Sequence, residues 1–280
     1  MINLNAATIE GMCYTDFIAF IKETNRCPGG KKSIRKIIQN SFINEKSKIL
    51  EIGSNTGFTS LEVAHLVKAK IFGIDISPSC VKESKQRLEA DTKDVKSRVK
   101  FRVGSAYNIP FKDEEFDLVI TGGATSFMED KETAISEYIR VTKPWGFIAT
   151  VQLYYRKHPP KKLLNKLSKV IGVDIKPYTE SDWLSVFQNS NKNLELYFYE
   201  PNELCEKPGS EVDDYIEYFL AKKHIAMLPV EEREAVRTKW RNYLTIFNEN
   251  HRYLGYSVAI FRKTLYPEEP ELFTYKKCKK

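Results

Sequence analysis

A glycine-containing segment, "ILEIGSNTGFTS" at residues 49–60, is the part of the chain best suited to hold a ligand. Gly53 and Gly57 let a ligand approach the main chain, and the helical pattern that follows directs free N–H groups to the same place. The dinucleotide pattern G-x-G-x-x-G fails, because Asn55 and Phe58 occupy its last two glycine positions. The Gly-Lys-Ser/Thr of a Walker phosphate loop is also absent. The loop therefore predicts a ligand without a phosphate group.

Two carboxylates accompany this loop. Glu51 lies inside the apolar run before it, and Asp75 ends the next apolar run, 18 residues beyond Gly57. A carboxylate at the tip of that second strand can accept hydrogen bonds from both hydroxyls of a ribose. The pattern predicts a ligand with a ribose and a net positive charge. Two simpler interpretations stay open: Asp75 could only cap the next helix, and Gly57 could only relieve helix–strand packing.

The elements that must position these residues alternate between strands and helices. Apolar runs separated by helical segments indicate parallel strands with right-handed crossovers. We therefore expect an α/β fold, a doubly wound, mostly parallel sheet of seven strands. The predicted strands are residues 48–52, 70–76, 99–104, 116–121, 146–153, 194–200 and 253–263.

Helical additions flank this sheet, and we expect them to pack on it. Residues 1–44 contain two amphipathic patterns separated by the turn "CPGG", and residues 201–252 form a helical insertion between the last two strands. The predicted organisation is an N-terminal helical segment at 1–44, a main domain at 45–262 and a tail at 263–280.

Five segments in order resemble the motifs of the class I S-adenosylmethionine (SAM)-dependent methyltransferases. They are "LEIGSNTG", "GIDIS", "VGSAYNIPF", "FDLVITGGA" and "VTKPWGFI", and they span about residues 45–150. Within the class the chain is most similar to the ubiquinone/menaquinone-biosynthesis type. The resemblance implies a Rossmann-like methyltransferase fold, SAM as cofactor and a small-molecule acceptor.

The resemblance also assigns the methionine end of the cofactor. Gly53 and Ser54 would line the methionine and ribose, Glu51 would face the amino group, and Thr121 would offer its main-chain oxygen near that group. The same glycine loop contributes Asn55 and Gly57.

The adenosine end is assigned in the same way. Asp75 would bind the ribose hydroxyls, Ile76 would cover one face of the adenine, and Ser105 and Ala106 would meet its edge. The family usually has aspartate where this chain has Ser105. A hydroxyl accepts the same hydrogen bond without a charge, so we expect weaker adenine binding.

Methyl transfer needs an in-line nucleophile held against the methyl carbon without water. A general base is required only when the acceptor is protonated. The segment "LYYRKHPP" leaves the fifth strand at the correct edge of the sheet, so His158 and Tyr154 are the candidate catalytic residues. The alternative for His158 is an ordinary surface histidine.

Family architecture implies that the N-terminal helices fold over the cofactor as a lid, with Tyr14 and Phe17 as the covering residues. An ordinary packing helix is an equal alternative. The insertion at 201–252 would complete the acceptor pocket or form a homodimer contact, and its aromatics favour an enclosed cavity.

The charge distribution and one segment disfavour a nucleic-acid methyltransferase. The net charge of +7 comes from lysines spread along the chain, which favours solvated faces over a nucleic-acid track. "TGGATSF" after the fourth strand also differs from the Asn/Asp-Pro-Pro-aromatic run of enzymes that methylate base amino groups. An RNA methyltransferase and a non-catalytic SAM-binding protein remain the alternatives.

Five scattered cysteines without CxxC spacing predict free thiols and no metal site. No signal peptide or membrane span is evident, so a cytoplasmic protein without membrane contact is expected.

Overall fold

A seven-stranded sheet forms the centre of the computed structural model, which describes residues 5–24 and 26–267. The strand order is β3-β2-β1-β4-β5-β7-β6, and β7 runs antiparallel to both of its neighbours. The predicted doubly wound, mostly parallel α/β sheet is confirmed. The strands are β1 (Lys48–Ile52), β2 (Lys70–Asp75), β3 (Val99–Val103), β4 (Phe116–Thr121), β5 (Thr142–Tyr155), β6 (Leu194–Glu203) and β7 (Leu254–Lys263).

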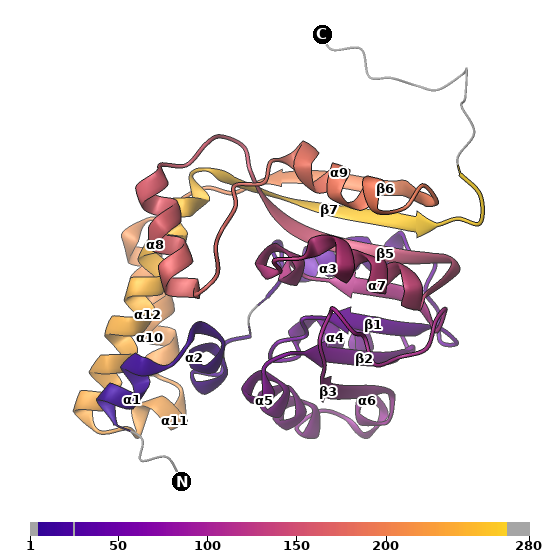
Figure 1. Cartoon of the computed structure of the whole chain (residues 1–280). Helices are drawn as coiled ribbons and strands as arrows, with labels where there is room; N and C mark the ends of the chain where they lie inside the picture. Colours follow the sequence, from indigo (N-terminus) through magenta and orange to yellow (C-terminus); the bar gives the residue numbers. More distant parts are fainter. Residues whose placement is uncertain (1–4, 25, 268–280) are drawn as a thin grey trace.

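Helices cover both faces of this sheet (Figure 1). One face packs against α3 (Lys31–Gln39), α4 (Phe58–Leu66), α5 (Pro78–Glu89) and α6 (Lys93–Arg98). The other face packs against α7 (Lys131–Val141) and α9 (Glu180–Ser190). The central strand β1 contributes Ile49 to the first core and Leu50 to the second. Burial on both faces explains why its sequence is a continuous apolar run rather than an alternating one.

Local signals set the ends of the helices beside the glycine loop. Gly57 precedes α4 with a φ of +87°, and Ser77 caps α5 by accepting a hydrogen bond from the Cys80 N–H. Pro78 occupies the first turn of α5, where its missing N–H costs nothing. These caps fix the two helices that follow β1 and β2.

A third apolar cluster joins the N-terminal helices to the helices that precede β7. It contains α1 (Ala6–Gly11), α2 (Tyr14–Phe20), α10 (Gly209–Leu220), α11 (Lys223–Ala226) and α12 (Val230–His251). Figure 1 shows these helices, with α8 (Lys161–Ile171), as a column beyond the carboxyl ends of the parallel strands. We call this column the helical cap.

The cap corrects one expectation. Its helices were expected to pack on the sheet, but they bury their apolar faces mainly against each other. The reason is that α2 and α12 present complementary aromatic stripes, for example Phe17 against Trp240 with ring centroids 5.9 Å apart. The cap therefore lies at the edge of the sheet where the glycine loop also lies. None of the described helices is long and apolar enough to cross a membrane.

Candidate cofactor-binding site

The glycine loop connects β1 to α4 and adopts backbone angles that favour glycine. Gly53, Asn55 and Gly57 have φ values of +70°, +44° and +87°. A Cβ added to Gly53 would lie 2.3 Å from the Ala124 Cβ, and one added to Gly57 would lie 2.9 Å from the Phe101 ring. Protein packing therefore requires both glycines, and the packing explanation for Gly57 holds whether or not a ligand also approaches it.

Glu51 is buried at the end of β1 and faces the first turn of α4. Its Oε2 atom accepts hydrogen bonds from the main-chain N–H and the hydroxyl of Ser60. Burial raises the pKa of this carboxyl to about 7, although those hydrogen bonds act in the opposite direction. Glu51 thus fixes the helix that starts at the loop. The predicted contact with a ligand amino group stays a prediction.

Asp75 ends β2 beside the same loop. Its Oδ2 accepts from the Asn55 N–H and its Oδ1 from the Ser77 N–H, each at 2.8 Å. Burial raises the pKa of the carboxyl above its usual value. Each carboxylate oxygen can accept a second hydrogen bond, so both oxygens remain able to receive a hydroxyl. Ser77, not Asp75, is thus the residue that caps α5, and the ribose-binding role of Asp75 stays a prediction.

The ends of β2 and β3 present an apolar edge next to Asp75. Ile76 is 73% exposed and Val103 is 51% exposed, which is unusual for large apolar side chains beside a buried carboxylate. Ser105 accepts a hydrogen bond from the Tyr107 N–H, and Ala106 is half-buried. This edge matches the position at which the sequence predicted the adenine.

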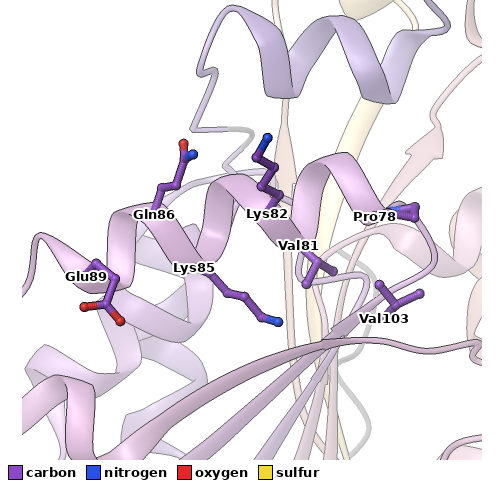
Figure 2. Close-up of a pocket in the computed structure, with 7 residues that line it drawn as sticks. All are labelled: Pro78, Val81, Lys82, Lys85, Gln86, Glu89 and Val103. Atoms are coloured by element: carbon purple, nitrogen blue, oxygen red, sulfur yellow. The ribbon is translucent and has the colours of Figure 1, made fainter. Parts of the chain in front are cut away.

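A surface hollow of about 390 Å³ begins at this edge (Figure 2). Pro78 and Val103 lie close together at one end of it, and the remaining lining residues follow α5. These residues are Val81, Lys82, Lys85, Gln86 and Glu89. The hollow extends along the outer side of α5, so it adjoins the predicted adenine edge without including the glycine loop.

Two hydroxyl groups lie in the glycine loop and at the end of β4. The Ser54 hydroxyl is buried and has no hydrogen-bond partner within the described chain. Thr121 ends β4, and its hydroxyl shares a hydrogen bond of 3.0 Å with that of Thr125. An orphaned buried hydroxyl is unfavourable unless another molecule satisfies it. Ser54 therefore fits a polar ligand at the loop.

The segment after α2 lies against this loop, which the sequence did not reveal. The main-chain oxygen of Glu23 accepts hydrogen bonds from the Thr56 hydroxyl at 2.7 Å and from Arg87 Nη2 at 2.9 Å. Farther along, the Cys27 Cβ would lie 3.0 Å from a Cβ on Gly122. The only sequence signal was the "CPGG" turn, which marks a bend but not its contacts.

The predicted lid residues pack on α12. Tyr14 packs edge-on against Tyr243 and Phe247, and Phe17 is fully buried between Trp240 and Tyr243. Both side chains attach α2 to α12, as in the packing-helix alternative. Covering of the substrate by these two residues stays a prediction.

The two candidate catalytic residues are not brought together with the loop. The Tyr154 ring is buried over Gly255 of β7, on the side of β5 away from β4. Burial raises the pKa of its phenol, so it stays protonated at neutral pH. His158 is exposed, and its side chain has no hydrogen bond or ion pair with any described residue. Their catalytic roles remain predictions.

Tyr154 also lines a second hollow of about 710 Å³ between the ends of β5 and β6 and the start of α9.

No three His, Cys, Asp or Glu residues of the described chain are arranged to hold a metal ion. Cys13, Cys27, Cys80 and Cys205 are free thiols, whereas Cys278 lies outside the described residues.

Residues 50–150 match the family model described as "Methyltransferase domain". These residues span β1 to β5 and include the loop, Asp75, Ser105 and Thr121. Residues 50–150 of this chain are a class I SAM-dependent methyltransferase domain. The predicted resemblance, enzyme class and cofactor are confirmed.

Named relatives agree with this assignment. Norajmaline N-methyltransferase of Rauvolfia serpentina is 34% identical over 42% of this chain and 43% of its own length. Demethylmenaquinone methyltransferase of Desulfitobacterium hafniense is 28% identical over 49% of this chain and 56% of its own length. The match to each of these relatives therefore spans about half of its length. Among solved structures, the MccD protein superposes with a TM-score of 0.72 at 25% identity, over 86% of this chain and all of that one.

Proposed function

We propose that this methyltransferase transfers the SAM methyl group to a small-molecule acceptor by in-line displacement. The observation that carries the proposal is the helical cap, which stands over the carboxyl edge of the sheet, where Asp75 and the glycine loop lie. Such a cap excludes water from the reacting atoms and limits the acceptor to one that fits beneath it. The relatives named above act, by their names, on norajmaline and on demethylmenaquinone.

The chain's own residues would bind and orient the cofactor. We assign the ribose hydroxyls to Asp75, one adenine face to Ile76 and the adenine edge to Ser105 and Ala106. The orphaned Ser54 hydroxyl supports a polar contact at the methionine end. SAM supplies an already activated methyl group, so the protein would accelerate the transfer mainly by positioning the acceptor and excluding water.

Acid–base assistance is needed only if the acceptor carries a proton at neutral pH. A phenol with a raised pKa makes Tyr154 a hydrogen-bond donor rather than a base. His158 is therefore the candidate base. Substitution of His158 by alanine should lower kcat for a protonated acceptor and leave SAM binding unchanged.

The test is a transfer assay with methyl-labelled SAM and the purified full chain. Fractionated metabolite extract and total RNA serve as parallel acceptor pools. Label in a small-molecule fraction supports the proposal. Label in RNA only would favour the RNA methyltransferase alternative, and SAM binding without transfer to any pool would favour the non-catalytic one.

A further inference from the structure

The segment after α2 is held from two sides. We call residues 21–24 and 26–28 the strap. On one side, the main-chain oxygen of Glu23 accepts hydrogen bonds from Thr56 and from Arg87, as described above. Thr56 is fully buried within the glycine loop, between Gly53 and Gly57. The position of Glu23 and the position of the loop are thus linked by direct hydrogen bonds.

On the other side, the insertion holds the same strap. The Tyr215 hydroxyl of α10 donates to Glu23 Oε2 at 3.0 Å. Lys222 Nζ donates to the main-chain oxygens of Ile21 at 3.2 Å and Lys22 at 2.6 Å. Its ammonium also lies 3.9 Å from the centre of the Phe219 ring. Two side chains about 200 residues away in sequence therefore also hold the strap.

Glu23 connects these two sets of bonds within one residue. Its side chain is bonded to the insertion, and its main-chain oxygen is bonded to the loop. The Tyr215 hydroxyl ties the buried Glu23 carboxylate to α10, whereas Thr24 Oγ1 donates to Glu23 Oε1 from within the strap. Loss of the Tyr215 hydroxyl removes this hydrogen bond to α10, which favours movement of Glu23 towards water. Such movement would also draw the main-chain oxygen away from Thr56. An ordinary packing contact remote from the loop would not have this effect.

We propose that Tyr215 and Lys222 are positioning residues that hold the strap on the glycine loop and thereby slow the release of SAM and of its demethylated product. The insertion then controls cofactor retention in addition to any part in the acceptor pocket. The inference rests on SAM binding at the loop and needs no knowledge of the acceptor.

The first test replaces Tyr215 by phenylalanine, which removes only the hydroxyl. We expect the demethylated product, S-adenosylhomocysteine, to dissociate about five- to tenfold faster in stopped-flow displacement, as suits the loss of one hydrogen bond to a charged group. Tyr218→Phe is the matched control, because Tyr218 lies on the same helix, is 64% exposed and has no hydrogen bond from its hydroxyl within the described chain. Lys222→Met should also speed release, whereas its exposed neighbour Lys223→Met should not.

A double-mutant cycle separates retention from general stability. Thr56→Val removes the hydroxyl on the loop side while keeping the side-chain shape. If the strap transmits the effect, Tyr215→Phe should add little to Thr56→Val. Fully additive effects on the dissociation rate would contradict the proposal, and so would a Tyr215→Phe variant that releases the product at the wild-type rate. A wild-type protein that binds no S-adenosylhomocysteine would instead overturn the cofactor assignment.

Discussion

At the residue scale, Asp75 carries most of the predicted recognition of the cofactor. Both of its oxygens already accept main-chain N–H groups, which fixes the carboxylate towards the loop without exhausting its lone pairs. Ser54 and Ile76 flank it as an orphaned hydroxyl and an exposed apolar side chain. The recognition therefore depends on a few groups that the fold holds in place before any ligand arrives.

Substitution of Asp75 tests that dependence. The wild-type protein should bind SAM with micromolar affinity, about −8 kcal/mol. Asp75→Ala should lose roughly 2 kcal/mol or more, because two ribose hydroxyls lose a charged acceptor. Asp75→Asn, which keeps an acceptor oxygen without the charge, should show an intermediate loss. Isothermal titration calorimetry measures all three, and equal dissociation constants would mean that the ribose is held elsewhere.

Glu51 predicts a pH dependence of stability. Its folded-state pKa of about 7 lies above the ordinary value of 4.5, so the folded protein binds a proton that the unfolded chain has released between those values. The resulting stabilisation is fully present below about pH 4.5 and is lost as the pH rises through about 7. It amounts to about 3 kcal/mol.

Urea unfolding of the wild type and of Glu51→Gln at several pH values measures this contribution. The difference in unfolding free energy between the two proteins should change over that interval, since the glutamine side chain does not titrate. Parallel stability curves from pH 4.5 to pH 8 would show that Glu51 keeps an ordinary pKa in the folded protein.

At the element scale, the strands were predictable and the cap was not. The seven apolar runs correspond to the seven strands. The inner strands β1, β4 and β5 are mostly buried on both faces, which gives them a continuous apolar signal. β5 nevertheless begins at Thr142 rather than at the predicted Gly146. Its first residues include Pro144 and Trp145, and Trp145 has a φ of +61°. Pro144 therefore belongs to the irregular start of this strand.

The sequence predicted which site residues lie at the strand ends, but not which distant helices contact one another. Asp75 and the loop lie together because carboxyl ends of adjacent parallel strands meet at one edge. The hydrogen bond between Tyr215 and Glu23 joins residues 192 positions apart, and no local pattern indicates which helices of a chain will pair. The contact of the Tyr154 ring with Gly255 of β7 was likewise not evident from the sequence.

The pairing of α2 with α12 predicts a large effect at Phe17. This side chain is fully buried between Trp240 and Tyr243, so Phe17→Ala should cost about 3–5 kcal/mol in unfolding free energy. Phe42→Ala is the control, because Phe42 is 69% exposed and should cost far less. Chemical denaturation measures both. A Phe17→Ala variant as stable as the control would mean that α2 does not pack on α12 in solution.

At the scale of the whole molecule, the glycine loop and the helical cap lie at the same edge of the sheet. The sheet supplies the glycine loop and the acidic residues, and the helical cap closes over them through the strap. The cap combines the N-terminal helices with the insertion that precedes β7, so under both proposals the acceptor space and cofactor retention depend on the same helices. This arrangement is the basis for proposing a small acceptor.

A crystal structure of the full chain with bound S-adenosylhomocysteine tests that claim most directly. We expect the ribose to lie on Asp75 and the sulfur to face an enclosed, largely aromatic cavity bounded by the N-terminal helices and the insertion. A sulfur that faces an open, lysine-lined surface would contradict the small-molecule assignment.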